Sequence, residues 1–564
     1  MKLVAGIDIG NSTTEIVIAD ASVDPPAVVA TERAPTRGLK GSAESGRAAA
    51  QLLARACRRL GLDVERTFLT PQRPVHTSRV DVPPEVPDLG RLTVISRGAS
   101  TPAGAGVGVG RPVPVDEAAT SLEGAAVVLV ASDPLGYRTT ATAVLRWQSA
   151  GANVVGLLLA GDEAALVAAR TEFDVPIVDS VNSSDALECD LIALEVAAPG
   201  QLVATLTDSV WLAHALGLTE DESGHARSAA ALTRSHRDAV IGRVADMSRQ
   251  RARPTPDRGS ITLRDSTELP LTAARSALAS TPPPSVLALR APGGPLMAAD
   301  DLWLVDLTDT SALPGVRVGS VADTALVVSA LAADAASDAG IDAFREEWPG
   351  AVDVVADEAT ASRRGALSTP GASGQSWVID LGGGTVDAVG PHGQTITAAG
   401  SGELMTAATS HALGISSGAA EWVKRGPASR VEAPHVMSDE SGERRFLDAA
   451  APHGTVGWLV VTGPSGSLPF SRTLPLAEWR TVRLSLKRQV FSDNVVRMLT
   501  GPSLSARPES VIFTGGPAGD DELLETLTPA FGNASVGRAR VAGTLDHRWA
   551  VAYGLVLVGV EQSA

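Results

Sequence analysis

Short apolar runs alternate along this chain with longer segments whose apolar residues recur at helical spacing. Residues 4–9 and 14–19 are two such runs, rich in Ile and Val, and the four small or polar residues between them are typical of a hairpin turn. Residues 45–60 repeat apolar positions at helical spacing, which predicts a helix. The alternation of strands and helices predicts an α/β fold.

The same rhythm continues in the next part of the chain. Three apolar runs predict strands, at residues 125–131, 154–159 and 175–178. Residues 163–170 predict the helix between the last two. This order indicates a parallel α/β domain of its own at residues 86–245. A glycine-rich stretch at residues 101–110 predicts a loop near its start.

Residues 250–285 have a different character, because Pro and Arg become frequent there, and they predict a weakly structured connector. The α/β rhythm returns from about residue 300. Further elements are expected there: an Ala-rich helix at 321–336, strands at 377–380 and 510–514, a helix within 397–413 and a buried helix at 549–560.

Length and charge narrow the class of protein. The chain has 564 residues and a formal net charge of −17, and a length of this order predicts about three to five domains. The acidic balance argues against binding to nucleic acid or to anionic lipid. The apolar run at 549–560 is shorter than the roughly 20 residues that cross a bilayer, and Asp8 falls where a signal peptide would be apolar. We therefore expect a cytoplasmic protein without a membrane segment.

One motif occurs twice. A strand that ends in Asp8 leads into a turn, and a strand that ends in Asp380 leads into a second, glycine-rich turn. Glycine lets backbone N–H groups approach phosphate oxygens without a Cβ in the way, and hydroxyl groups add donors. The turn residues predicted to bind phosphate are Gly10, Asn11, Ser12, Thr13, Gly382, Gly383, Gly384 and Thr385. The two Asp carboxylates suit the water shell of Mg²⁺. Such a site uses backbone N–H groups and Mg²⁺ rather than lysines, which fits the acidic composition. Either turn alone could also be an ordinary hairpin.

A third motif follows the predicted strand at residues 510–514. Gly515 and Gly516 stand between this strand and a segment of helical pattern at 520–527. A strand that ends in two glycines allows a flat base and a ribose to approach closely, although the same pattern also fits a plain strand–helix turn.

These three segments resemble the phosphate-1, phosphate-2 and adenosine motifs of the actin-like ATPase superfamily. Residues 356–361 and 550–554 resemble its two connecting helices, where small residues permit close packing. The resemblance implies a two-lobed ATPase that binds ATP or ADP with Mg²⁺. It makes Asp8, Asp380 and Glu358 the catalytic residues, with Glu358 orienting the attacking water unless it is only a solvated helix charge.

Four further segments are similar to the large subunit of diol/glycerol dehydratase-reactivating factors, namely residues 5–15, 101–106, 194–200 and 399–414. This likeness adds Gly402 and Glu403 to the nucleotide-binding residues. It implies a chaperone-like ATPase that releases damaged cobalamin from an inactivated adenosylcobalamin-dependent dehydratase. It also implies subunit exchange with a small partner that resembles the dehydratase β-subunit, and hence a hetero-oligomer.

The resemblance implies the domain order as well. The expected segments are a first ATPase segment at 1–85, an inserted swivelling-type α/β domain at 86–245, a connector at 246–300 and the ATPase remainder at 301–564. In the family the inserted domain holds a second metal, Mg²⁺ or Ca²⁺. Its ligands correspond to Thr101, Asp162 and Asp179 in this chain. Both acids follow predicted parallel strands, where open α/β sheets bind ligands, but they could also be solvated loop acids.

Three other functions compete. A polyol or sugar kinase on the same scaffold needs a catalytic Asp in the first lobe, and Asp24 lies in a Pro-rich loop instead. A filament-forming actin-like protein fits poorly with a large inserted domain. An iron–sulfur activator needs clustered cysteine thiolates, whereas this chain has only Cys57 and Cys189, far apart in the sequence.

Overall fold

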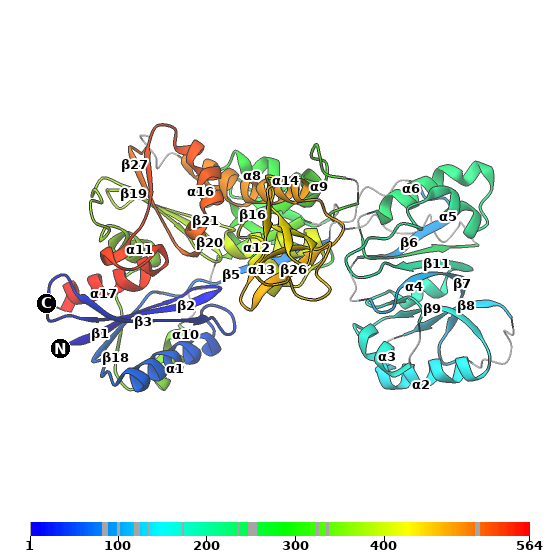
Figure 1. The fold of residues 1–564 in the computed structure, drawn as a ribbon, viewed down its shortest axis with the longest axis horizontal. Coiled ribbons are helices and arrows are strands. Elements are labelled where there is room, and N and C mark those ends of the chain that lie inside the picture. The colour runs from blue at the N-terminus through cyan, green and yellow to red at the C-terminus, as the bar shows by residue number, and fades with distance from the viewer. Residues whose placement is uncertain are drawn as a thin grey trace.

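Two five-stranded sheets with the same topology lie at the end of the molecule that carries both chain termini (Figure 1). The computed structural model describes residues 2–81, 88–98, 102–117, 124–132, 135–171, 174–234, 236–245, 257–317, 319–322, 326–333, 338–501 and 508–563. The strand orders are β18-β4-β1-β2-β3 and β21-β20-β19-β27-β28. In each sheet the first three strands in sequence pair antiparallel and the last two pair parallel.

The bounds of the first sheet are β1 Leu3–Ile9, β2 Thr13–Asp20, β3 Ala27–Pro35, β4 Arg66–Leu69 and β18 Ala351–Val354. Those of the second are β19 Trp377–Leu381, β20 Thr385–Val389, β21 Thr395–Ala399, β27 Ser510–Thr514 and β28 Ser535–Arg538. Both expected hairpins are therefore confirmed, β1 with β2 and β19 with β20. The sequence showed only the repeated turn motif, whereas the structure repeats a whole sheet.

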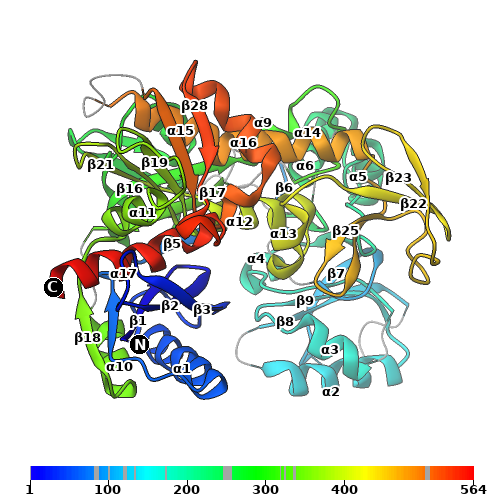
Figure 2. The same ribbon diagram turned by 60° about the vertical axis from the view of Figure 1, so that its left-hand side comes forward.

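Helices α11, Glu358–Ala366, and α17, Ala550–Ser563, pack against each other between the two sheets (Figure 2). Glycines permit this approach, because a Cβ on Gly554 would lie 1.8 Å from the carbonyl oxygen of Ala361. The small residues of the second connecting segment have the packing role that the sequence suggested.

Helices α1, Ala43–Leu60, and α10, Ala339–Glu347, pack together on the outer face of the first sheet (Figure 1). Ser42 caps the start of α1 through a hydrogen bond from the Ser45 N–H, and Gly61 ends the helix in the left-handed region with φ of 65°. The expected helix at 45–60 is confirmed.

A third sheet occupies the region expected to be a connector. Its strand order is β14-β13-β15-β16-β17-β5. The bounds are β5 Val75–Val80, β13 Ser260–Leu263, β14 Glu268–Pro270, β15 Val286–Arg290, β16 Leu296–Asp306 and β17 Leu326–Ala332. Helix α8, Leu271–Ala279, and the short α9, Leu307–Ser311, follow β14 and β16 in the chain. The prediction of weak structure is thus wrong for residues 260–290. Their apolar side chains join the same hydrophobic core as the second sheet.

The Ala-rich segment at 321–336 was expected to be a helix, and the structure contradicts this. Residues 326–332 form β17, which pairs on both sides, with β16 and with β5. Six of its seven residues are buried. Pairing and burial on both faces outweigh the modest helical preference of alanine.

The inserted region forms a separate body at the end of the molecule opposite the two chain termini (Figure 1). Its seven-stranded sheet has the order β10-β9-β8-β7-β11-β12-β6. The strands are β6 Leu92–Arg97, β7 Gly106–Pro114, β8 Ala126–Ala131, β9 Asn153–Leu159, β10 Ile177–Val178, β11 Leu191–Val196 and β12 Asp238–Arg243. The helices are α2 Gly136–Ser149, α3 Ala164–Thr171, α4 Ser183–Leu187, α5 Ser209–Ala215 and α6 Ser223–Thr233.

Part of the glycine-rich stretch expected to be a loop is strand β7. Gly108 explains this, because a Cβ there would lie 2.1 Å from the carbonyl oxygen of Val155 on a nearby strand. Glycine is required in this strand by close backbone approach rather than by a turn.

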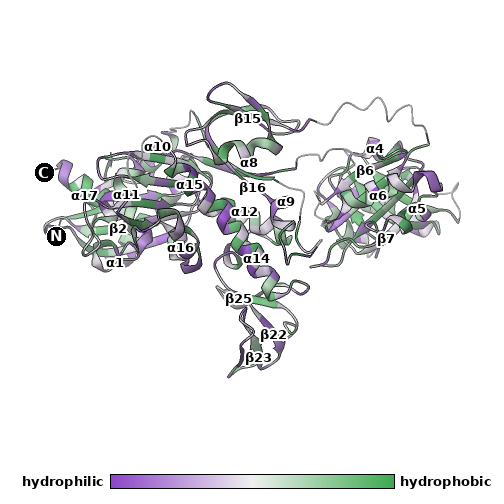
Figure 3. Ribbon diagram, turned by 90° about the horizontal axis from the view of Figure 1, so that it is seen from above, coloured by the Kyte–Doolittle hydropathy of each residue, from purple (hydrophilic) through white to green (hydrophobic). Residues whose placement is uncertain are grey.

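A small antiparallel sheet projects from the second lobe (Figure 3). Its order is β24-β23-β22-β25-β26, with bounds Ser429–Ala433 for β22, Val436–Ser438 for β23, Arg444–Phe446 for β24, Leu459–Gly463 for β25 and Gly466–Ser471 for β26. The second lobe also contains α12 Gly402–Leu413, α13 Ser417–Val423, α14 Leu476–Lys487, α15 Asp493–Leu499 and α16 Asp521–Leu527. Among the described residues no helix is long and apolar enough to cross a membrane.

Candidate functional site

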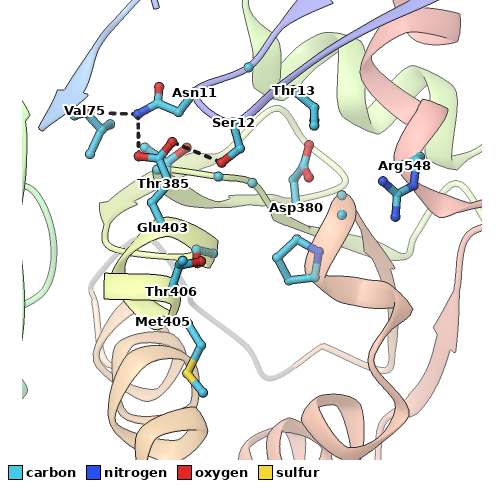
Figure 4. Close-up of a pocket in the computed structure, with 18 of the residues that line it drawn as sticks. Asn11, Ser12, Thr13, Val75, Asp380, Thr385, Glu403, Met405, Thr406 and Arg548 are labelled. Carbon is cyan, nitrogen blue, oxygen red and sulfur yellow. Dashed lines mark hydrogen bonds between the residues drawn. The ribbon is translucent and has the colours of Figure 1, made fainter. Parts of the chain in front are cut away.

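The turns of the two hairpins meet at a cavity of about 1200 Å³ that is lined by both lobes (Figure 4). Every residue that the sequence assigned to the nucleotide or to catalysis lines this cavity. These residues are Asp8, Gly10, Asn11, Ser12, Thr13, Glu358, Asp380, Gly382, Gly383, Gly384, Thr385, Gly402, Glu403, Gly515 and Gly516.

The first turn is closed by short contacts. The Gly10 N–H donates to the carbonyl of Thr13 at 2.9 Å, and the hydroxyl of Thr36 donates to the carbonyl of Gly10 at 2.8 Å. A Cβ on Gly10 would lie 2.8 Å from the Thr13 carbonyl oxygen. The turn therefore depends on glycine at its first position.

The second turn is held by the start of α12. The carbonyls of Gly382, Gly383 and Gly384 each accept a hydrogen bond from a backbone N–H of residues 400–403, at distances of 2.8 to 3.2 Å. The Ser401 hydroxyl also donates to the Gly382 carbonyl at 2.8 Å. With these carbonyls engaged, the backbone of the turn is fixed where it lines the cavity.

The two lobes touch at these turns. The Asn11 amide donates to Glu403 Oε2 at 3.3 Å, and the Ser12 hydroxyl donates to Glu403 Oε1 at 3.0 Å (Figure 4). The Asn11 amide also donates to the carbonyl of Val75 on β5 at 2.9 Å. A Cβ on Gly383 would lie 2.7 Å from the Ser12 hydroxyl oxygen, so the approach needs a glycine.

Four buried acids lie on the paired strands behind the turns. Asp8 lies opposite Glu15, and Asp380 lies opposite Asp387. Burial is the main cause of a raised pKa in each. It lifts Glu15 and Asp387 to about 7, Asp380 to about 6, and Asp8 well above its ordinary value. The Asp8 Oδ1 has no hydrogen-bond partner among the described atoms. Positive charge in the cavity would lower all four pKa values.

Lys40 was missed by the sequence analysis. Its ammonium pairs with Glu358 Oε2 at 2.5 Å, and its side chain is 6% exposed. Burial disfavours its charge, but Glu358 and Asp8 outweigh this and raise its pKa. Lys40 stands in a loop that belongs to no motif, so no sequence pattern pointed to it. It adds a lysine to the wall of a cavity for which the sequence analysis named only backbone N–H groups and Mg²⁺.

Three charged residues on and after α13 were also missed. Glu421, Lys424 and Arg425 line the cavity from the end of α13. Lys424 donates to the carbonyl of Gly402 at 2.8 Å, and Arg425 stacks over the ring of Trp422 at 4.3 Å. The spacing of one acid followed by cations three and four residues later could have revealed one helix face. A carboxylate suits ribose hydroxyls, and a guanidinium plane suits a flat base.

Gly515 and Arg548 complete the wall. Gly515 has φ of 83°, and a Cβ there would lie 2.4 Å from Asp380 Oδ1, so only glycine lets the end of β27 pass this acid. Arg548 precedes α17 and lines the cavity on the side away from Glu403 (Figure 4). Burial lowers its pKa. No motif pointed to this arginine.

Two of the three expected metal residues of the inserted domain, Asp162 and Asp179, lie apart from this cavity. Thr101 lies outside the described residues. Asp179 is fully buried after β10 and accepts a hydrogen bond from the Ala164 N–H at 3.2 Å, while Asp162 is exposed after β9. The two loops adjoin through a hydrogen bond from the Ser180 N–H to the carbonyl of Gly161 at 3.4 Å. Among the described residues no three of His, Cys, Asp or Glu form a group that could hold a metal ion.

Two sheets of this repeated topology, facing each other across a cavity with glycine turns, define a protein of the actin-like ATPase fold. Two protein-family models match the chain. Residues 90–246 match the DD-reactivating factor swiveling domain, and residues 300–559 match the diol dehydratase reactivase ATPase-like domain. The chain belongs to the family of dehydratase-reactivating factor large subunits.

Individual relatives agree along the whole length. The propanediol dehydratase-reactivating factor large subunit of Salmonella typhimurium is 27% identical, with 99% of this chain and 98% of the relative covered. The diol dehydratase-reactivating factor large subunit of Klebsiella michiganensis is 28% identical over the same shares. The solved structure of a glycerol dehydratase reactivase is 25% identical, with a TM-score of 0.55 and 100% of both chains covered.

Proposed function

We propose that this chain binds ATP with Mg²⁺ between its lobes, hydrolyses it, and uses the cycle to reactivate an adenosylcobalamin-dependent diol or glycerol dehydratase. The observation that carries the nucleotide part is the meeting of two glycine turns at one cavity, with Asp8 and Asp380 at their base. The names of its relatives support the client part, because they are reactivating factors of propanediol dehydratase or diol dehydratase.

In this proposal the two turns bind the phosphates. Backbone N–H groups of residues 10–13 and 382–385 donate to phosphate oxygens, and the hydroxyls of Ser12 and Thr385 add donors. Gly515 and Gly516, which follow β27, also line the cavity and leave room for the nucleoside, and Glu421 and Arg425 are further lining residues.

The cavity suits a cation between its acids. The Asp8 Oδ1 has no hydrogen-bond partner among the described atoms, and burial raises the pKa values of Asp8 and Asp380 although Lys40 lowers both, so further positive charge would favour their ionised forms. A bound Mg²⁺ would neutralise phosphate charge there. Glu358 accepts a hydrogen bond from the attacking water and orients it, and Lys40 holds this carboxylate in position through their ion pair.

The reactivation step is assigned to the chain together with a small subunit. The relatives are named large subunits, and we propose that this chain likewise has a small partner. This partner resembles the dehydratase β-subunit and exchanges with that subunit in the cytoplasm, which frees damaged cobalamin. A nucleotide can drive this exchange only if it binds two conformations with different affinity. The inserted domain would hold a second Mg²⁺ or Ca²⁺ at Asp162 and Asp179, with Thr101.

The test of the whole proposal mixes the chain and its small partner with glycerol-inactivated dehydratase, ATP, Mg²⁺ and fresh adenosylcobalamin. We expect dehydratase activity to recover, and not to recover without ATP or without the small partner. No recovery with either a glycerol or a propanediol dehydratase would contradict the proposal. Formation of a phosphorylated polyol in the same mixture would point to the kinase alternative instead.

Asp8→Asn and Asp380→Asn test the site directly. Each keeps the shape of the side chain and removes the charge that would hold the cation, so we expect Mg²⁺-dependent ATP hydrolysis to fall by about 100-fold. Phosphate release from ATP is the measurement. Asp63→Asn, an exposed acid after α1, is the control and should keep full activity. If both site variants hydrolyse ATP normally, the site assignment is wrong.

A further inference from the structure

A fully buried ion pair joins the third sheet to the second lobe. Asp301 lies on β16 and Arg497 on α15, and both side chains are 0% exposed. The Arg497 guanidinium donates to both carboxylate oxygens of Asp301 and lies over the ring of Trp303 at 4.6 Å. The Ser285 hydroxyl donates to Asp301 Oδ1 at 2.7 Å. These contacts satisfy a charge pair from which water is excluded.

The same network ends on the backbone of residues 399 and 400. Asp301 Oδ2 accepts a hydrogen bond from the Ala399 N–H at 2.8 Å. Buried Asn494 donates to the carbonyls of Ala399 and Gly400, both at 2.9 Å, and its own oxygen accepts from Arg497 at 2.7 Å. Three side chains from two elements thus fix a single short stretch of main chain.

That stretch begins the turn that holds the second phosphate loop. The Gly400 N–H donates to the carbonyl of Gly384 at 2.8 Å, and the Glu403 N–H donates to that of Gly383, also at 2.8 Å. A continuous series of hydrogen bonds therefore runs from Asp301 and Arg497 to the loop. The side chains in this series are buried, and the remaining steps are hydrogen bonds between backbone groups.

The cost of burying this ion pair indicates that it positions the backbone and does more than stabilise the fold. A buried ion pair costs desolvation, and replacing such a pair by apolar residues of similar volume is often neutral or stabilising. A plain hydrophobic contact between β16 and α15 would therefore hold the fold as well. Only hydrogen-bonding groups, however, can fix the donors and acceptors of residues 399 and 400.

We propose that Asp301, Arg497 and Asn494 are positioning residues that hold the second phosphate loop in its nucleotide-binding shape and fix it to the third sheet. This rests on the proposed nucleotide function. The third sheet also carries the inserted domain, because β5 precedes that domain in the chain and β13 follows it. The network therefore joins the loop to the sheet through which nucleotide binding would move the inserted domain.

Asn494→Leu tests the proposal, since it keeps the volume and removes both hydrogen bonds to the backbone. Arg497→Lys is the milder second variant, because it keeps the charge and loses the bond to Asn494. The matched control is Arg275→Met. Arg275 joins the same elements through Asp493 at 2.7 Å and the Leu304 carbonyl at 3.0 Å, and lies over the same Trp303 ring. Among the described residues it forms no hydrogen bond or ion pair with residues 399–403.

Three quantities are measured on the full chain: the Kd for ATP with Mg²⁺, the thermal midpoint, and amide hydrogen exchange of the peptide over residues 381–385 without nucleotide. We expect Asn494→Leu to raise the Kd by about tenfold, as for one well-placed hydrogen bond lost. It should also speed exchange in that peptide. Arg275→Met should change the Kd by less than about twofold at an equal or larger loss of thermal midpoint.

The possible outcomes distinguish the positioning role from the nucleotide function on which it rests. Unchanged exchange and unchanged Kd in folded Asn494→Leu and Arg497→Lys would overturn the positioning role. The positioning role would also be overturned if Arg275→Met lost as much affinity for ATP as Asn494→Leu, with each loss in proportion to the fall in thermal midpoint. Faster exchange at 381–385 together with a wild type that binds no ATP would support the positioning of the loop and reject the nucleotide function.

Discussion

At the residue scale the cavity contains buried carboxylates whose pKa values are raised. Asp387 has its pKa raised to about 7 by burial and by Glu358, although the hydroxyls of Thr397 and Thr385 donate to it. Glu15 is raised to a similar value mainly by burial. Groups of this kind make the folded protein bind protons that the unfolded chain has already lost, so they also make stability depend on pH.

Asp387→Asn should therefore change the pH dependence of stability. Between the ordinary carboxyl pKa near 4 and the folded value of about 7, the folded state binds more protons, so this group makes the protein less stable as pH rises. Its effect is at most about 1.4 kcal/mol per pH unit. We expect thermal midpoints of wild type to fall more steeply than those of the variant from pH 5 to 7.

Comparing wild type with Asp387→Asn cancels the contribution of two histidines, which changes stability with pH in the opposite direction. Burial lowers the pKa of His236 to about 3 and of His411 to about 4, which destabilises the fold at low pH in both proteins alike. Parallel curves for wild type and Asp387→Asn would show that Asp387 titrates normally.

Glu403 is the second prediction at this scale. Its carboxylate accepts hydrogen bonds from Asn11 and Ser12, two of the donors proposed for phosphate. Glu403→Gln keeps an acceptor oxygen and removes a negative charge next to the phosphates. We expect ATP to bind about three- to tenfold more tightly, as for the loss of one partly screened like charge. Weaker binding would instead indicate that Glu403 helps to hold the cation. Fluorescent-nucleotide titration at two salt concentrations is the measurement.

At the scale of elements the contact between α11 and α17 sets the distance between the two sheets. A Cβ on Gly554 would lie 1.8 Å from the Ala361 carbonyl, and one on Gly365 would lie 1.9 Å from that of Ala550. Backbone on one helix thus lies directly against glycine on the other, in both directions. Glu358 stands in the first turn of α11, so this contact also places a catalytic candidate.

Gly554→Ala should therefore destabilise the chain even though alanine is the better helix former. The added methyl group must push α11 and α17 apart, and overpacking of this kind costs about 1–3 kcal/mol. Gly224→Ala in α6 meets open space and should be neutral or stabilising by up to about 1 kcal/mol. Urea unfolding curves give both values. A stable Gly554→Ala protein with unchanged ATP hydrolysis would show that the helices can separate freely.

At the scale of the whole molecule the inserted domain has its own interior. Its hydrophobic clusters contain only residues between 89 and 244, and no described cluster joins them to the ATPase lobes. Polar contacts to the lobes do occur, from Arg79 to the Gly98 carbonyl at 3.3 Å and from Thr473 to the Gly200 carbonyl at 3.3 Å. The domain is therefore attached by its two chain connections and by contacts at its surface.

We expect residues 88–245, produced alone, to fold and to unfold cooperatively. A domain of this size with its own core buries enough apolar surface for independent stability. Circular dichroism during heating is the measurement, and the full chain should show a transition at the same temperature. A fragment without a cooperative transition would mean that the lobes are needed to complete its core.

Local sequence patterns determined the hairpins, the helix at 45–60 and the turn residues of the site, because apolar periodicity, glycine and capping act over a few neighbouring positions. They did not determine β17 or the sheet at 260–290. Strand pairing with segments far along the chain decided those, against the preference of alanine and the abundance of proline. The same holds for Lys40, Glu421 and Arg548. Each stands outside the recognised motifs. Glu421 and Arg548 have charged neighbours nearby in the sequence, whereas Lys40 meets Glu358 only in the folded chain, and the meeting of the two lobes places all three in the wall of one cavity.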